Sequence, residues 1–269
     1  MQNLRHIKLI LIGDVVAKLG RKVLAEILPM LQKKYKPDAV IANIENLAHG
    51  KGVTKKTLTE LSELGVTAFT GGNHAWKKED PTSDEIRGSF ALALPANDPR
   101  TVALLASASL KVAGETLHII SLEGQLGMNE EGIGSPFLAF DQLYDGFGKP
   151  KLLLLDFHAE MTSEKGAMGF YADGRASVVY GTHTHIPTAD ARILAGGTGF
   201  ITDIGMTGSN DSVLGVDKHV IIDRFLGNKK TFEYPESGPS WLNAIYCELD
   251  PKTGHCTMIK QVQEYLTIN

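Results

Sequence analysis

The sequence has little cysteine and no excess of positive charge. Its 269 residues include two cysteines, Cys247 and Cys256, nine positions apart. The two would be able to face each other on neighbouring strands, but two unpaired core thiols in a reducing compartment are the favoured interpretation. The formal net charge of -4 argues against an extended nucleic-acid-binding surface. A small nucleotide remains compatible with it, since one local site needs only local positive charge.

The sequence also lacks the patterns typical of membrane proteins, secreted proteins and several common enzyme classes. No apolar run reaches the roughly 18 residues of a membrane span, so no membrane partner is expected. The stretch 6–12 is too short before Asp14 to be a signal peptide, and a cytoplasmic location is the default. The sequence contains no Gly-x-Ser-x-Gly, Walker or Gly-x-Gly-x-x-Gly motif, which disfavours serine hydrolases and the common nucleotide-binding loops. Without repeats or a break in composition, residues 1–269 are expected to form a single domain.

Strand-like and helix-like patterns alternate along the chain. A buried-strand run at 7–12 is followed by helical spacing over 21–35, with Pro29 inside it, and the pattern repeats with a strand at 39–42, a helix at 54–64 and a strand at 66–70. This opening predicts parallel strands between helices. Further strands are expected at 117–122, 151–157, 177–180, 191–194 and 200–202, helices at 138–144 and 160–171, and a terminal hairpin over 243–261. We therefore expect an α/β fold with two sheets packed face to face and helices outside.

Short polar clusters stand where the apolar runs end. They are Gly13-Asp14, Glu45-Asn46, Gly72-Asn73-His74, Asp156-Phe157-His158 and Gly181-Thr182-His183-Thr184-His185. Taken alone, each is more typical of a turn or loop. Ligands of α/β sheets, however, bind beyond the carboxyl ends of the strands, and carboxylate, amide and imidazole groups bind divalent metals. Together the clusters predict one composite metal site.

The sharpest of these clusters is His183-Thr184-His185. In an extended segment, residues two apart point to the same side. We therefore expect both imidazoles to face one pocket and Thr184 to face away from it.

The number of candidate ligands indicates two ions. The candidates are Asp14, Glu45, Asn46, Asn73, His158, His183 and His185, too many for one tetrahedral ion and suited to two that share a bridging carboxylate, for which Glu45 is the candidate. Two ions about 3.5–4 Å apart favour in-line displacement at phosphorus, with a bridging hydroxide as nucleophile. His74 would protonate the leaving oxygen or stabilise the developing charge. The alternative is that His74 orients another ligand.

At these positions the sequence resembles the calcineurin-like metallophosphoesterases, and most closely their YmdB-like branch. The matching segments lie in order between residues 12 and 217, and include 12–16, 42–46, 50–52, 72–76, 156–165, 181–190 and 202–208. The wider superfamily has Asp-x-His at the first motif and a bridging Asp. Here Val16 stands at the place of that His, and Glu45-Asn46 replaces the bridging Asp, a pattern that marks the branch.

The resemblance implies a four-layer α/β/β/α sandwich and a metal-dependent phosphoric diester hydrolase acting on 2′,3′-cyclic nucleotides. It implies one ion held by Asp14, Glu45, Asn46 and His185, a second held by Glu45, Asn73, His158 and His183, and a catalytic His74. Iron or manganese is the implied metal, with zinc as a further candidate. Alternative functions are a broad phosphomonoesterase or nucleotidase, and a regulatory metalloprotein that binds a nucleotide.

Other polar residues carry weaker signals. Lys51, between two glycines, would meet a phosphate or lie free at the surface, and His49 is interpreted as a solvated loop residue. Lys165 is interpreted as part of an ordinary helix cap beside His158, and Asp203 as a residue of the cleft lining. Segments 125–148 and 205–240 would form either the substrate rim or a subunit contact in a homo-oligomer.

Overall fold

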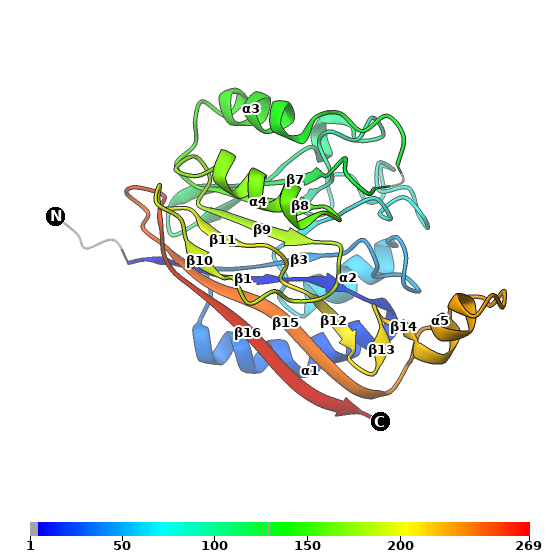
Figure 1. Cartoon of the computed structure of the whole chain (residues 1–269). Helices are drawn as coiled ribbons and strands as arrows, with labels where there is room; N and C mark the ends of the chain where they lie inside the picture. Colours follow the sequence, from blue (N-terminus) through cyan, green and yellow to red (C-terminus); the bar gives the residue numbers. More distant parts are fainter. Residues whose placement is uncertain (1–4, 129) are drawn as a thin grey trace.

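Two β-sheets packed face to face form the centre of the molecule (Figure 1). The computed structural model describes residues 5–128 and 130–269. In spatial order the larger sheet contains β2 (Asp14–Val15), β12 (Met206–Ser209), β15 (Gly238–Leu249), β1 (Ile7–Ile12), β3 (Ala39–Asn43), β4 (Ala68–Thr70) and β5 (Leu92–Ala93), with β16 (Cys256–Ile268) also paired to β15. The smaller sheet contains β10 (Arg192–Ile193), β11 (Gly199–Ile201), β9 (Val178–Thr182), β8 (Leu153–His158), β7 (Glu115–Glu123) and β6 (Ala108–Val112). A separate hairpin pairs β13 (Ser212–Val213) with β14 (Val216–Asp217).

Helices cover the outer face of each sheet. The helical elements are α1 (Ala17–Tyr35), α2 (Lys55–Glu63), the 3-10 turn η1 (Ala103–Leu105), α3 (Pro136–Gly146), α4 (Thr162–Tyr171) and α5 (Lys218–Phe225). Leu24 of α1 and Leu58 of α2 pack with the larger sheet, whereas Phe140 of α3 and Met168 of α4 pack with the smaller one. Figure 1 shows α1 below and α3 and α4 above the two sheets. The predicted α/β/β/α sandwich is confirmed.

The layers follow from the alternation of side chains along the strands. In β1, Ile10 and Ile12 point to the α1 side, while Leu9 and Leu11 join the core between the two sheets, as the two-residue period of a strand requires. Strand β1 pairs in parallel with β3, and β3 with β4, so the predicted parallel opening is confirmed. The shared core is consistent with a single domain, which stays a prediction.

The predictions from the sequence also missed or misplaced several helices and strands. Helix α1 begins at Ala17, four residues before the expected start, and β16 continues to Ile268. Strand β6 has an alternating exposed pattern and lies at a sheet edge, so it lacked the dense apolar signal of a central strand. Both cysteines are free and buried, as expected. Among the described residues, no helix combines the length and apolar character needed to cross a bilayer.

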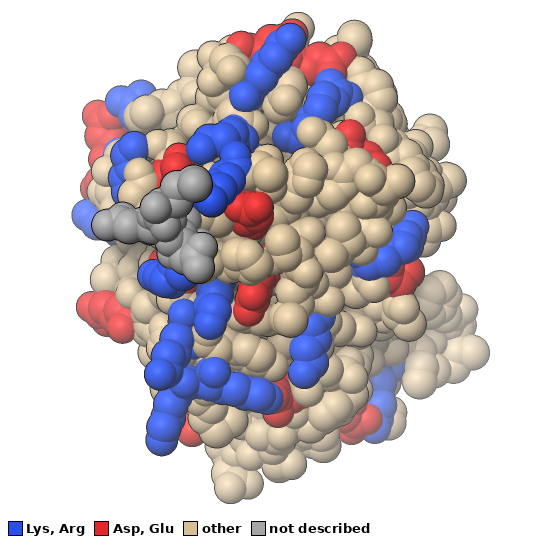
Figure 2. Space-filling model, turned by 90° about the vertical axis from the view of Figure 1, so that its left-hand side faces the viewer, with Lys and Arg blue, Asp and Glu red and all other residues tan. Residues whose placement is uncertain are grey.

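One end of the molecule carries both positive and negative side chains, as the modest net charge of the chain leads us to expect. Figure 2 shows the face on the N-terminal side, where Lys and Arg side chains lie among Asp and Glu side chains. That face carries charges of both signs. The predicted metal ligands lie at the other end, where the parallel strands finish (Figure 1).

Candidate metal centre

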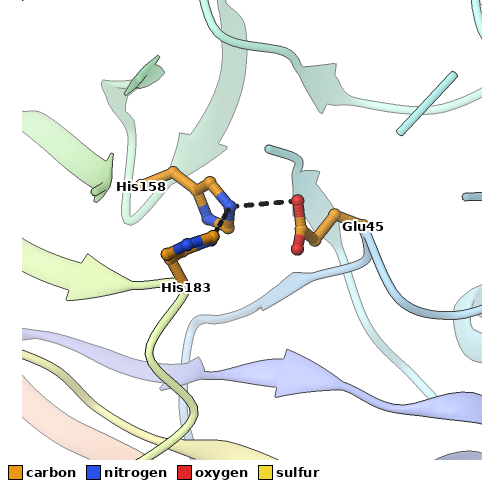
Figure 3. A group of neighbouring side chains, drawn as sticks. All are labelled: Glu45, His158 and His183. Atoms are coloured by element: carbon orange, nitrogen blue, oxygen red, sulfur yellow. Dashed lines mark hydrogen bonds and ion pairs between the residues drawn. The ribbon is translucent and has the colours of Figure 1, made fainter. Parts of the chain in front are cut away.

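The carboxyl ends of strands from both sheets bring the predicted ligands together. Glu45 follows β3 and Asn73 follows β4, while His158 ends β8 and His183 follows β9. Glu45, His158 and His183 each offer one atom within 4.8 Å of the others, and Asp14, Glu45 and His185 form a second such group. Glu45 belongs to both groups. Figure 3 shows the Glu45 carboxylate approaching the two imidazoles from the opposite sheet.

The first group surrounds one ring nitrogen of His158. His158 Nε2 lies 3.0 Å from Glu45 Oε2, 3.3 Å from Asn73 Oδ1 and 3.1 Å from His183 Nδ1. A single ring hydrogen cannot serve three such neighbours. Donor atoms bound tetrahedrally at about 2.1 Å lie about 3.4 Å apart, close to these separations. The donor set therefore fits a cation.

The second group contains a buried carboxylate oxygen without a partner. Asp14 Oδ1 is buried and accepts no hydrogen bond from the described residues; the ring nitrogen His185 Nε2 lies 3.8 Å from it. That nitrogen is also 3.1 Å from Asn46 Oδ1. Buried polar atoms are normally paired, so the orphaned oxygen fits a second cation, next to Glu45.

The charges of the cluster show the same need for positive charge. Burial raises the pKa of Asp14 to about 6, against the opposing charges of His185 and His158. Burial opposes protonation of His158, yet the charge and hydrogen bond of Glu45 raise its pKa to about 9. Burial, followed by the charge of His158, lowers the pKa of His183 to about 3. Burial would raise the pKa of Glu45, but His158 and His74 hold it well below its usual range. A protonated His158 thus supplies the charge that a metal would bring.

Neighbouring groups fix the orientation of the imidazoles. His158 Nδ1 lies 2.9 Å from Thr182 Oγ1, whose hydroxyl donates to Asp156. His183 Nε2 lies 3.1 Å from Glu160 Oε2, and His185 Nδ1 lies 3.0 Å from the Leu214 carbonyl oxygen. Hydrogen bonds at one ring nitrogen leave the other to face the site, the pattern common around metal-binding histidines.

The predicted extended geometry of His183-Thr184-His185 is wrong. The φ angles of His183 and His185 are 93° and 66°, in the left-handed region that residues with a side chain rarely adopt. The reversed backbone sends His183 to one ligand group and His185 to the other. Thr184 does not simply face away, because its backbone N–H and hydroxyl both donate to Asp203 Oδ2, at 3.2 and 2.8 Å.

A glycine makes room where the two sheets meet. A Cβ atom on Gly72 would lie 2.2 Å from His158 Nε2 and 2.5 Å from Glu45 Oε2, far inside contact distance. Glycine at this position therefore lets the loop that carries Asn73 and His74 pass the ligand cluster.

Comparison with known proteins identifies the family to which the chain belongs. The model of the family described as YmdB-like protein matches residues 10–262. The chain belongs to the YmdB-like family. A 2′,3′-cyclic-nucleotide 2′-phosphodiesterase of Bacillus subtilis is 41% identical over 256 residues, covering 95% of this chain and 96% of the relative. The predicted family is confirmed.

Solved structures support the family and the fold. A crystal structure of a novel phosphatase of Mycoplasma pneumoniae superposes with a TM-score of 0.91 at 33% identity, covering 99% of this chain and 95% of the other. The NAD nucleotidase of Haemophilus influenzae, at a TM-score of 0.59 and 14% identity over 97% of this chain and 50% of the other, shares the fold alone.

Sequence reasoning overlooked or misjudged several residues around the YmdB-like centre. Lys165 is not a helix-capping residue, since its ammonium group is buried and donates to Asp203 and to the Thr182 carbonyl. Asp203 is buried as well and does not line the cavity at the centre. Glu160 was missed, although the acidic residue directly after the Asp156–Ala159 motif was a usable signal. His49 is exposed, as expected, whereas Lys51 lines the cavity.

Proposed function

We propose that this protein is a dinuclear metal-dependent phosphodiesterase. The observation that carries the proposal is the position of Glu45, whose carboxylate belongs to both ligand groups. A carboxylate shared in this way is what two neighbouring ions require of a bridging ligand. The buried oxygen of Asp14, which has no hydrogen-bond partner among the residues that the structure describes, supports the second ion independently of the first.

The ligand sets that we propose follow the contacts. Asp14, Glu45, Asn46 and His185 would hold one ion, and Glu45, Asn73, His158 and His183 the other. Iron or manganese is the metal that we propose, with zinc as the competing candidate, because mixed imidazole and oxygen donors suit all three. When bound, such ions polarise a phosphoryl oxygen and lower the pKa of water enough to make it a nucleophile at neutral pH.

His74 is the residue that we propose as the proton donor and charge stabiliser. Its side chain is 22% exposed and lines the same cavity as Glu45 and His183. His74 Nδ1 lies 3.1 Å from Glu45 Oε1, so the carboxylate fixes the orientation of the ring. An imidazolium at the cavity wall would stabilise charge on the phosphoryl group and protonate the leaving oxygen.

The contacts of His74 also favour the alternative that it orients ligands. His74 Nδ1 lies 3.3 Å from Asn46 Nδ2, and the His74 backbone N–H donates to Glu45 Oε2 at 3.1 Å. The backbone contact survives side-chain truncation, whereas the ring contacts do not. Metal content in His74→Ala therefore separates the two roles.

A 2′,3′-cyclic nucleotide is the substrate that we propose. The name of the Bacillus subtilis relative supports this substrate. A cavity of about 710 Å³, large enough for one nucleotide, also reaches Glu45, His74 and His185. The competing activity is hydrolysis of phosphomonoesters, which the same two ions would serve.

Hydrolysis of 2′,3′-cyclic AMP by the purified protein tests the proposal. We expect turnover that depends on added manganese and that falls about 10²–10⁴-fold in His74→Ala while both ions stay bound. Loss of metal from His74→Ala would instead assign His74 to ligand orientation. Hydrolysis of adenosine monophosphate but not of the cyclic diester would contradict the phosphodiesterase and favour the phosphomonoesterase.

A further inference from the structure

The cavity at the metal centre has a second wall that the reaction itself does not need. Residues 212–234, called the arm below, contain the β13–β14 hairpin, helix α5 and the segment that follows it. Figure 1 shows α5 projecting beyond the ends of the strands, outside the main body. From the arm, apolar and aromatic residues including Val213, Leu214, Phe225, Phe232 and Tyr234 line the cavity opposite Glu45 and His183.

Both ends of the arm are tied to the candidate metal centre. At the front, the Leu214 carbonyl oxygen lies 3.0 Å from His185 Nδ1. At the back, Tyr234 packs against Gly50 so closely that a Cβ on Gly50 would lie 2.0 Å from its ring. The Gly50 carbonyl oxygen in turn accepts from Asn46 Nδ2 at 3.0 Å. The arm is therefore positioned by two of the proposed ligands.

Phe225 is exposed although it lines the cavity. Its side chain is 88% exposed, and that of the next residue, Leu226, is 74% exposed. In α5 only Val220 is buried, so Phe225 contributes little to the core. Val213, Leu214 and Phe232 at the same cavity are also partly exposed, so Phe225 belongs to an apolar patch of the kind that marks a contact surface for a ligand.

Positive charge accompanies the aromatic wall. The Arg224 guanidinium lies 4.8 Å and the Lys51 ammonium 5.5 Å from the centroid of the Phe232 ring. Both cations line the cavity. A ligand that matches this lining is anionic at the metal end and planar and aromatic at the arm. A nucleotide has both properties, and a phosphorylated sugar or glycerol lacks the second.

We propose that the arm forms a base-binding subsite, in which the exposed Phe225 stacks on the nucleobase, while Phe232 holds Lys51 and Arg224 at the cavity, where they attract the phosphate. The assignment of the phosphate to the metal centre rests on the proposed phosphodiesterase activity, whereas the assignment of the base to the arm does not. Stacking on aromatic side chains tolerates every base because each base has a π-face. The subsite therefore selects nucleotides as a class over phosphodiesters without a base.

Kinetics with and without a base test the subsite. The variants are Phe225→Ala and, as a matched control, Leu226→Ala, since Leu226 is exposed beside Phe225 but does not line the cavity. We expect Phe225→Ala to raise KM for 2′,3′-cyclic AMP about 5- to 150-fold with little change in kcat. For glycerol 1,2-cyclic phosphate, a cyclic diester without a base, both variants should match the wild type. Equal KM values for 2′,3′-cyclic AMP in Phe225→Ala and wild type would overturn the subsite.

Equilibrium binding separates this proposal from the catalytic one. Titration calorimetry of the manganese-loaded protein with adenosine, which has no phosphoester to hydrolyse, should show binding that Phe225→Ala weakens and Leu226→Ala preserves. That result without any turnover of 2′,3′-cyclic AMP would support the subsite and contradict the phosphodiesterase. If Phe225→Ala changed the oligomeric mass and left adenosine binding intact, Phe225 would be a subunit contact and the subsite would be overturned.

Discussion

The ammonium group of Lys165 and the carboxylate of Asp203 form a buried ion pair, with Nζ 2.6 Å from Oδ2. Each side chain is 1% exposed. Because the same carboxylate oxygen also accepts from both the N–H and the hydroxyl of Thr184, the pair holds the residue between His183 and His185. The left-handed conformations of these two histidines are costly for residues with a side chain. The ion pair therefore fixes a turn that would otherwise relax away from the metal centre.

Removing the charge of Asp203 should show that the turn at His183 and His185 depends on the buried ion pair. In Asp203→Asn the Lys165 ammonium is left buried without its counter-charge, and we expect a loss of about 3–5 kcal/mol in the free energy of unfolding together with weaker metal binding. Urea denaturation and metal analysis measure the two effects. Asp211→Asn is the control, since Asp211 pairs with Lys218 at 2.7 Å on the surface, where such pairs contribute about 1 kcal/mol or less. Wild-type stability in Asp203→Asn would contradict the positioning role.

Metal uptake should release protons. The pKa of His158 is raised to about 9 by Glu45 despite burial, so at pH 7.5 the metal-free site holds His158 in its protonated form. A metal ligand must be neutral imidazole, and we expect about one proton released per chain from this residue at pH 7.5, falling as the pH approaches 9 and passes it. Calorimetric titration with Mn²⁺ in buffers of different ionisation enthalpy measures the number. A binding enthalpy independent of the buffer would show that His158 is neutral beforehand.

Glu123 should make the metal-free protein less stable as the pH rises. Both of its carboxylate oxygens are buried and accept no hydrogen bond from the described residues. Burial raises its pKa from 4.5 to about 7, against the charge of His158 and with smaller contributions from the charges of Asp98, Glu130 and Glu45. The folded state therefore binds more protons than the unfolded state between these values, and the stability contributed by this group falls from pH 4.5 to pH 7 and then stays constant.

The variant Glu123→Gln removes this loss. We expect it to be roughly 3 kcal/mol more stable than the wild type at pH 8, since each pKa unit corresponds to about 1.4 kcal/mol, and to match it near pH 4.5. Denaturation of both metal-free proteins across this range provides the test. A stability difference that does not change with pH would rule out titration of Glu123 as its source.

The sequence predicted which residues lie together at the candidate metal centre, and this prediction has a simple physical basis. Parallel strands bring their carboxyl ends to one edge, so Glu45 and Asn73 had to lie near each other once β3 and β4 were recognised. The apolar runs of β1 and β8 were dense enough to place Asp14 and His158 in the same way. Local pattern was therefore sufficient for residues that directly follow a central strand.

Other features depend on contacts that no local pattern contains. Lys165 and Asp203 are 38 positions apart, and nothing beside either residue marks it as half of a buried pair. The turn at His183 reverses because Asp203 holds Thr184, so the alternation rule failed there. Helix α5 buries only Val220, and an element that hardly contacts the core leaves almost no apolar period to detect.

The metal content of Glu45→Ala tests the central claim most directly. Purified wild type loaded with manganese should hold two ions per chain, and Glu45→Ala should lose or weaken both, because one carboxylate is shared between the two groups. Glu236→Ala is the control, since Glu236 is 64% exposed, pairs with Lys18 at the surface and belongs to neither ligand group; it should keep two ions. Elemental analysis after gel filtration gives the ratio. Two tightly bound ions in Glu45→Ala would contradict a bridging carboxylate and, with it, the dinuclear account of this site.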